Sequence, residues 1–231
     1  MNIGILALGR PTFDIEFANQ KLNQCLKYLN STNHKIYGSC QLLLDSELTL
    51  KEIENLKDAP TDFIIILQVT FTDASMTVKI AKSFSSNIGI WSIPEPRLGG
   101  RLRLNSFCGL NLASHALSLN NIKFSWLYQD PEKIDNNQFN DFVNDKVEIK
   151  IPEILSESSS SKAGERIKNK IKSLKIAKIG NHPDGFDTCK YEPSKLNALS
   201  GVSVKEIELS ELFETAKKIS KDKVKKTYKK L

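Results

Sequence analysis

The sequence lacks the features of several protein classes. Its longest apolar run, Phe63–Leu67, is far too short to span a membrane. It has no G-x-G-x-x-G fingerprint and no glycine-rich phosphate loop that ends in Lys-Ser or Lys-Thr, so a nucleotide cofactor has no support. Its three histidines, His34, His115 and His182, do not have the spacing of metal ligands. We therefore expect no membrane association, and no metal site formed by this chain alone.

Cysteine is also scarce. The four cysteines contain no Cys-x-x-Cys pair and are widely spaced, at Cys25, Cys40, Cys108 and Cys189. This usage favours free thiols in a reducing cytoplasm over a disulfide framework or a zinc site. We expect a cytoplasmic protein in which the cysteines are small core residues. The apolar start, Met1–Gly9, has no basic lead-in and no small-residue cleavage pattern, so it predicts a strand and not a signal peptide.

Arginine is rare, and its few copies are clustered. The chain has 28 lysines and only five arginines, and three of the five, Arg97, Arg101 and Arg103, lie in one loop. Arg10 follows the first predicted strand. A guanidinium is a planar fork of donors that can hold a carboxylate or a polyol in a fixed geometry. The cluster predicts either the polar wall of a pocket or a brace that binds the carbonyls of its own loop, and the two roles are compatible.

The positive charge is concentrated in two segments. Lys162–Lys175 has six basic residues and one acid, and Lys217–Leu231 has eight lysines and one acid, so the charge of these two segments together exceeds the net charge of +6 and the remaining chain is slightly acidic. Aromatic residues that could stack on bases are missing from both segments except for Tyr228. We therefore interpret the lysines as solvated helix faces and a lysine-rich tail, and we expect no nucleic-acid partner.

Strands and helices alternate along most of the chain. This alternation predicts an α/β fold, a Rossmann-like, doubly wound parallel sheet with right-handed crossovers. In such sheets ligands bind outside the carboxyl ends of the strands. Three polar loops leave strand ends, at Gly9–Asp14, Gln68–Asp73 and Ser92–Asn105. We expect these loops to border one crevice.

The segment Asp130–Ser161 is polar and is predicted to have little regular structure. We place a boundary within it, so that residues 1–155 form the first domain and residues 156–231 form a partial second α/β domain with a lysine-rich tail. The second part has only two predicted strands, too few for an independent core. Either it docks on the first domain, or the chain is the front part of a longer protein.

Several motifs, read together and in order, carry a family resemblance. They are Leu8–Asp14, Gln68–Asp73, Trp91 with Pro94–Arg97, Gly100–Ser106 and His182–Asp187. In this order they resemble the amino-terminal half of the L-fucose isomerase-like family, which is related to L-arabinose isomerase. The resemblance runs from Met1 to about Phe213. It implies an enzyme that interconverts aldoses and ketoses, usually with manganese, and that works as a homo-oligomer on a monosaccharide.

The resemblance also implies roles for residues of the predicted crevice. Arg10 and Trp91 resemble substrate-contacting residues, with Trp91 stacking on the sugar ring, and Glu95 and Gln68 are further candidates. Arg97 would bond sugar hydroxyls or order its loop. The remaining substrate-binding candidates in the crevice are Thr70, Asp73 and Asn105, although Asp73 could equally be a helix cap and Asn105 can cap a helix.

The sequence departs from the family by stopping before any segment that could carry the catalytic metal. Moving a proton or hydride between sugar carbons needs a metal or donors that hold both oxygens, and a base. We therefore expect no catalytic residue, no bound manganese and no isomerase activity in this chain alone, as in a truncated protein. The alternative is an α/β module that binds a sugar or small acid without catalysis.

Overall fold

The computed structural model describes residues 1–146 and 162–230. They form two compact units, each considered by itself below. The first unit comprises residues 1–150 together with Asp184–Thr188, and the second comprises the rest. The domain boundary that we predicted at residue 155 lies outside the described residues.

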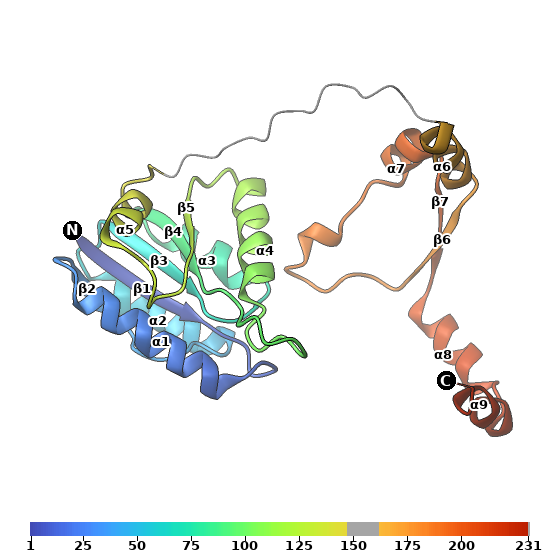
Figure 1. The fold of residues 1–231 in the computed structure, drawn as a ribbon, viewed down its shortest axis with the longest axis horizontal. Coiled ribbons are helices and arrows are strands. Elements are labelled where there is room, and N and C mark those ends of the chain that lie inside the picture. The colour runs from blue at the N-terminus through green and yellow to red at the C-terminus, as the bar shows by residue number, and fades with distance from the viewer. Residues whose placement is uncertain (147–161, 231) are drawn as a thin grey trace. The chain divides into compact units, whose positions relative to one another are not determined.

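The first unit contains a five-stranded parallel sheet with the strand order β2-β1-β3-β4-β5 (Figure 1). Its strands are β1 (Asn2–Leu8), β2 (Lys35–Gly38), β3 (Phe63–Gln68), β4 (Asn87–Ser92) and β5 (Ser125–Tyr128). The order changes direction between β1 and β3. At such a switch point the loops leave toward opposite faces of the sheet, which opens a crevice at the carboxyl ends of the two strands.

Helices cover both faces of this sheet. The sheet has a separate hydrophobic core on each face. Buried residues of α1 (Ile15–Asn30) and α5 (Asn136–Val143) belong to the core on one face. The other side carries α2 (Ser46–Lys57), α3 (Ser75–Ser83) and α4 (Ser106–Leu119). Because β3 is covered on both sides, each of its residues is buried, as its unbroken apolar run predicts. The predicted doubly wound α/β fold is confirmed.

Cysteine placement differs from our interpretation. Cys25 lies in the core under α1, but the other three thiols, at Cys40, Cys108 and Cys189, are exposed. All four are free. The thiol of Cys25 has a raised pKa because burial disfavours its charged form. The prediction of free thiols is thus confirmed, and their assignment to the core is wrong for three of the four.

Helix α5 contradicts our prediction of little regular structure after Asp130. Its start is fixed by a capping box, in which Asp135 accepts from the Gln138 backbone N–H and the Gln138 side chain accepts from that of Asp135. Its apolar residues Phe139 and Phe142 are buried against the sheet. Burial of these two rings stabilises a helix that a polar composition alone would not predict.

The short segment Asp184–Thr188 belongs to the first unit although residues on both sides of it belong to the second. The ring of Phe186 lies 5.7 Å from that of Phe71, and the Gly185 carbonyl accepts a hydrogen bond from the Ala74 N–H. Gly185 has a φ of +79°, in the left-handed region that glycine adopts without strain. The segment therefore contacts the loop after β3.

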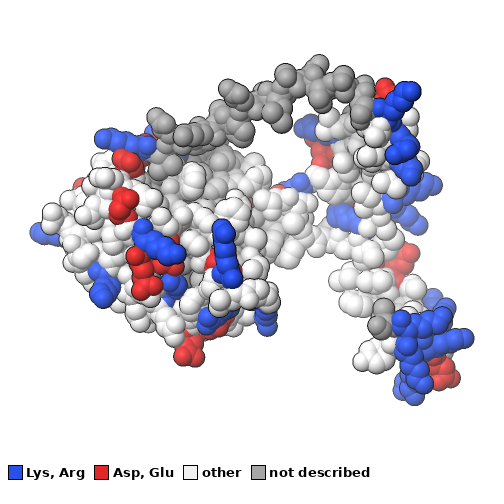
Figure 2. Space-filling model, viewed as in Figure 1, with Lys and Arg blue, Asp and Glu red and all other residues white. Residues whose placement is uncertain are grey.

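The second unit has one parallel pair of strands, β6 (Lys175–Ile179) and β7 (Ser203–Ile207). Its helices are α6 (Lys162–Lys172), α7 (Pro193–Ser200), α8 (Leu209–Lys217) and α9 (Lys221–Tyr228). A 3-10 turn, η1 (Asp187–Cys189), lies where the chain passes from the segment Asp184–Thr188 of the first unit back to the second. No described residue of these four helices is buried, as expected for so little sheet. Lysine side chains gather around α9 (Figure 2).

Within the described ranges, no helix is both long and apolar enough to cross a membrane.

Candidate functional site

The three loops that we expected to meet do meet. Hydrogen bonds between backbone and side-chain groups join the loops after β1, β3 and β4 to one another. These bonds run from the Arg10 N–H to the Thr70 hydroxyl (2.8 Å), from the Phe71 N–H to the Leu104 carbonyl (2.8 Å), and from the Asp14 N–H to the Arg103 carbonyl (3.1 Å). The loops after β1, β3 and β4 are thus joined to one another, with Thr70 as a buried link. No residue of Ser92–Asn105 lines the pocket described next, so the expectation that all three loops border one crevice is wrong.

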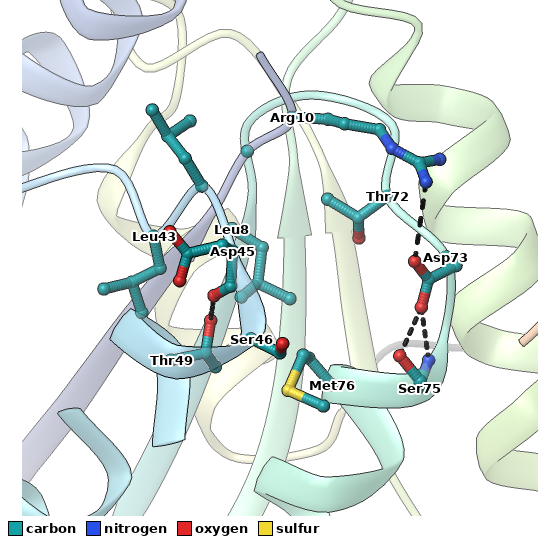
Figure 3. Close-up of a pocket in the computed structure, with 12 residues that line it drawn as sticks. Leu8, Arg10, Leu43, Asp45, Ser46, Thr49, Thr72, Asp73, Ser75 and Met76 are labelled. Carbon is teal, nitrogen blue, oxygen red and sulfur yellow. Dashed lines mark hydrogen bonds and ion pairs between the residues drawn. The ribbon is translucent and has the colours of Figure 1, made fainter. Parts of the chain in front are cut away.

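A pocket of about 250 Å³ opens at the switch point, where β1 and β3 end (Figure 3). The end of β1 and the starts of α2 and α3 supply its walls. They contribute Leu8, Gly9, Arg10, Leu43, Leu44, Asp45, Ser46, Thr49, Thr72, Asp73, Ser75 and Met76. Its size suits a monosaccharide-sized molecule. Beside a few apolar side chains, its lining has hydroxyls, two carboxylates and one guanidinium, which can exchange hydrogen bonds with a polar ligand.

Arg10 and Asp73 face each other at this pocket, as Figure 3 shows. A guanidinium nitrogen of Arg10 lies 3.8 Å from the Asp73 carboxylate, and 40% of the Arg10 side chain is exposed. At that distance the ion pair is loose, so Arg10 keeps donors for a ligand. The other carboxylate oxygen of Asp73 accepts from the N–H and the hydroxyl of Ser75. Asp73 therefore also binds Ser75 at the start of α3, although the N-cap of that helix is Ala74 and not Asp73.

The wall formed by α2 was missed by sequence reasoning. The N-cap residue Asp45 accepts from the Leu48 N–H at 2.8 Å, and the Thr49 hydroxyl donates to the Asp45 carbonyl at 2.7 Å. A backbone bridge between Leu8 and Leu43 brings this turn to the end of β1. Our reading followed the loops after the longer strands and ignored the loop after β2. The cap pattern before α2 was the available signal.

Trp91 does not have the place that we predicted. Its side chain is completely buried, its ring is 6.0 Å from Tyr28 and 6.1 Å from Phe139, and its Nε1–H donates to the Gln129 carbonyl at 3.0 Å. The role of Trp91 in stacking on a sugar is therefore wrong for this structure. The physical reason is that β4 is covered by helices on both faces, so alternate side chains are buried on either side.

Gln68 is also completely buried, so it does not line the pocket surface. Its side-chain amide donates to the Thr70 carbonyl at 2.6 Å and to the Thr72 hydroxyl at 2.9 Å. Gly109 of α4 provides the room, since a Cβ there would come within 2.9 Å of the Gln68 side chain. Gln68 thus stabilises the loop after β3 through hydrogen bonds from a buried side chain.

Glu95 braces its own loop. Its carboxylate accepts three backbone hydrogen bonds, from Arg103 (2.6 Å), Leu104 (3.0 Å) and Asn105 (2.8 Å). Asn105, at the N-cap of α4, has a φ of +50° and makes no capping bond with its side chain. Both residues are half-buried and lie outside the pocket at the switch point. Both carboxylate oxygens of Glu95 accept hydrogen bonds from backbone N–H groups, which is a structural role.

The arginines divide between the two roles that the sequence left open. Arg103 donates to the Asp14 carboxylate at 2.9 Å and lies 3.7 Å over the Phe17 ring, and Arg101 donates to the Thr12 carbonyl. Both therefore brace loops. Arg97 is exposed and, among the described residues, has no hydrogen bond or ion pair. The pKa of Asp14 lies below its ordinary value because the Phe17 N–H and the Arg103 guanidinium both bind its carboxylate.

The residues described here form no group of three or more His, Cys, Asp or Glu side chains that could hold a metal ion. The manganese implied by the resemblance therefore has no matching donor set among them.

Comparison with known proteins gives a family for the chain. Residues 4–150 match the family described as "Fucose/sulfoquinovose isomerase, N-terminal domain". Among curated proteins, the chain is similar to the sulfoquinovose isomerase of Clostridium sp. (strain MSTE9), with 30% identity over 93% of this chain and 44% of that protein. It is also similar to those of Alkalicoccus urumqiensis, with 28% identity over 94% and 45%, and of Priestia aryabhattai, with 26% over 92% and 44%.

The chain thus spans less than half the length of the curated relatives it matches. The matched residues 4–150 include all of the five-stranded sheet except the first two residues of β1, together with its loops and the pocket at the switch point. The family match and the resemblance from the motifs agree, and the chain belongs to the fucose/sulfoquinovose isomerase family, with residues 4–150 corresponding to its N-terminal domain.

Proposed function

We propose that the chain supplies the substrate-holding part of an aldose–ketose isomerase whose substrate is a monosaccharide with a sulfonate group. The motif resemblance named the L-fucose isomerase-like family and left the sugar open. The three relatives above are all named sulfoquinovose isomerase, and this favours a sulfonated sugar. The observation that carries the proposal is the guanidinium of Arg10, partly exposed at a pocket of the matched domain.

The chemistry of the pocket supports such a ligand. A sulfonate, like a carboxylate or a phosphate, presents several oxygens that match the fork of donors on a guanidinium. The hydroxyls of Ser46 and Thr72 also line the pocket and can exchange hydrogen bonds with sugar hydroxyls. The side chain of Met76 adds an apolar surface for the carbon skeleton. The proposed role of the pocket is to hold and orient the sugar.

Isomerisation itself needs charge stabilisation at two oxygens and a base, which the described residues do not bring together. We therefore expect that the 231-residue chain binds its sugar without turning it over. The family resemblance further suggests a homo-oligomer, and manganese as the metal of the full-length family members. The cysteine usage suggests a cytoplasmic protein, and the lysine-rich segments without interleaved aromatic residues suggest no nucleic-acid partner. A pure binding module remains the second candidate, because Arg10 and its pocket would serve it equally well.

Calorimetric titration with sulfoquinovose, L-fucose and L-arabinose, with and without manganese, tests the proposal. Replacement of the guanidinium in Arg10→Ala is expected to weaken binding of the sulfonated sugar by about 10-fold to 100-fold, because hydrogen bonds to charged groups are involved. Arg97→Ala is the matched control, since Arg97 is exposed and lies outside the pocket. Equal effects of the two variants, or no binding of any sugar, would refute the assignment.

Turnover separates the two candidate functions. Proton NMR of sulfoquinovose incubated with the chain and manganese follows any conversion to the ketose. Binding without conversion agrees with a substrate-holding part of an isomerase. If binding is also the same for sugars that cannot be isomerised, such as methyl glycosides, the binding module is favoured, because an isomerase pocket is expected to accept the open-chain or reducing sugar.

A further inference from the structure

The outer edge of strand β5 is unpaired in the described structure. β5 is the last strand of the sheet order, next to β4 on one side only. The N–H of Gln129, just after β5, donates to the Ser92 carbonyl of β4. The backbone N–H and C=O groups of successive strand residues point alternately to the two sides of the strand. Those of Leu127, two residues before Gln129, therefore also face β4. Trp126 and Tyr128 therefore direct their N–H and C=O groups away from the sheet.

An apolar groove lies beside this edge. It has a volume of about 690 Å³ between α4 and β5, and its lining includes Phe107, Leu110, Ile122, Phe124 and Trp126. Trp126 is 39% exposed and Phe107 is 50% exposed. The Phe107 ring packs on Tyr128, with 4.9 Å between centroids. Large exposed aromatic side chains beside an open strand edge are the usual composition of an interaction surface.

The edge of β5 is short, with four residues, but it lacks the charged side chains and proline with which soluble proteins also protect unpaired strands. Charged side chains, proline and bulges normally keep such edges apart. The residues of β5 are Ser125, Trp126, Leu127 and Tyr128, none of them charged or proline. The nearest groove lysine, Lys123, is neutralised by Asp145 at 2.5 Å. Two copies of this edge can therefore approach without like charges meeting.

A further strand from the same chain is a poor occupant of the edge. Helix α5 follows β5 and packs on the face of the sheet that carries α1. A strand reached directly from α5 on that face would have to make a left-handed crossover to lie outside β5. Such crossovers are rare, about 2% of cases. The occupant is better sought in another molecule.

We propose that β5 is a dimerisation strand, which joins a second copy of this chain edge to edge and antiparallel about Leu127. In that register the N–H and C=O of Trp126 meet those of Tyr128 of the second copy, and the reverse pair forms by symmetry. The sheet then continues through both copies. The ring of Trp126 lies opposite Tyr128 of the second copy, an aromatic cross-strand pair over the groove. The proposal is independent of which sugar the pocket binds.

Sedimentation velocity of the 231-residue chain, from about 1 to about 100 μM, tests the dimer. The chain is expected to shift from monomer to dimer across this range. Trp126→Lys puts a charge on the edge, and Trp126→Pro removes an outward N–H while leaving the β4–β5 bonds in place. Each is expected to weaken dimerisation at least about tenfold. Leu199→Lys is the control, an exposed leucine of α7 that should leave the dimer unchanged.

Hydrogen exchange of the unsubstituted chain is the second measurement and does not depend on how the variants fold. The amides of Trp126 and Tyr128 are expected to exchange fast in the dilute monomer and to gain protection as dimer forms. A monomer at every concentration, a dimer that both edge variants retain, or protection of these amides in the dilute monomer would each overturn the proposal. The last result would mean that another part of the chain covers the edge.

Discussion

The carboxylate of Glu95 lies 2.8 Å from the backbone nitrogen of Asn105, ten residues further along the chain, and accepts a hydrogen bond from it. Together with the bonds from Arg103 and Leu104, this contact closes the loop between β4 and α4 onto a single side chain. The loop in turn holds the loop after β1 through Arg103 and Asp14. Glu95 therefore determines the shape of this edge of the sheet without lining the pocket.

Glu95→Gln is expected to lower the free energy of unfolding by about 1–3 kcal/mol, because an amide group replaces an acceptor and leaves a backbone donor unpaired. Urea unfolding measures the change, and hydrogen exchange should accelerate at the amides of residues 103–105. Glu214→Gln in α8, an exposed glutamate whose partner among the described residues is Lys217, should change stability far less. A stable Glu95→Gln protein with loss of sugar binding alone would instead favour a direct role at the ligand.

Trp91→Phe separates a core role from a sugar-binding role. The substitution removes the bond from Nε1 to the Gln129 carbonyl and part of the ring volume, so we expect a loss of about 1–2 kcal/mol in unfolding free energy. The affinity for sugars should stay within twofold, about the precision of calorimetry. A large loss of affinity at unchanged stability would restore the stacking role that the sequence suggested.

Asp73→Asn tests the balance of charge around Arg10. The asparagine oxygen can still accept from the Ser75 N–H, so the change in stability should stay below about 1 kcal/mol. Removal of the competing carboxylate leaves the guanidinium free for an anionic ligand. We expect the affinity for a sulfonated sugar to rise by about twofold to fivefold in calorimetry. Asp222→Asn in α9 controls for the change in net charge, and an equal gain there would point to a non-local effect.

The stability of the first unit should depend on pH through Asp14. Its folded pKa lies below the ordinary value of 3.8, so the stabilising contribution is complete above that value and is lost as the pH falls through the lower folded pKa. Asp14→Asn keeps the acceptor for the Phe17 N–H and removes the charge opposite Arg103. Its melting temperature should be lower than that of the unsubstituted chain at pH 7, and the difference should shrink between about pH 5 and pH 2.

Asp45→Asn is the matched control for this pH dependence. Asp45 caps α2 as Asp14 caps α1, and among the described residues it has no ion pair. The melting temperature of Asp45→Asn should follow that of the unsubstituted chain more closely over the same pH range. Identical curves for both variants would show that the charge opposite Arg103 has no effect of its own.

The layers of the fold could be predicted from the sequence because they follow from periodicity. The apolar run at Phe63–Leu67 requires cover on both faces, and the polar residues after each strand mark its carboxyl end. The same reasoning should have placed Trp91 in the core, since it lies within a strand of that sheet. Helix α5 was missed because its polar residues outnumber its buried rings, although the capping box at Asp135 was readable.

The candidate site was harder to predict because the hydrogen-bond partners of its side chains depend on the conformation of the loops. Nothing in the spacing of Glu95 and Asn105 indicates that the carboxylate turns back onto the backbone of residues 103–105. Similarly, Arg10 and Arg97 have the same chemistry, and only the fold places one at a pocket and leaves the other exposed. The wall from α2 depends on a bridge between Leu8 and Leu43, a contact between segments far apart in sequence.

The place of Asp184–Thr188 in the first unit has a consequence for how the polypeptide matures during synthesis. The ring of Phe186 and the carbonyl of Gly185 reach their partners on the loop after β3 only once residue 188 has left the ribosome, long after the last strand of the large sheet has emerged. A fragment that stops at residue 150 would keep the sheet and the contact of Phe13 with Phe71, and would lose the contact of Phe186 with Phe71. Proteolytic sensitivity at that loop would then distinguish the fragment from the intact chain.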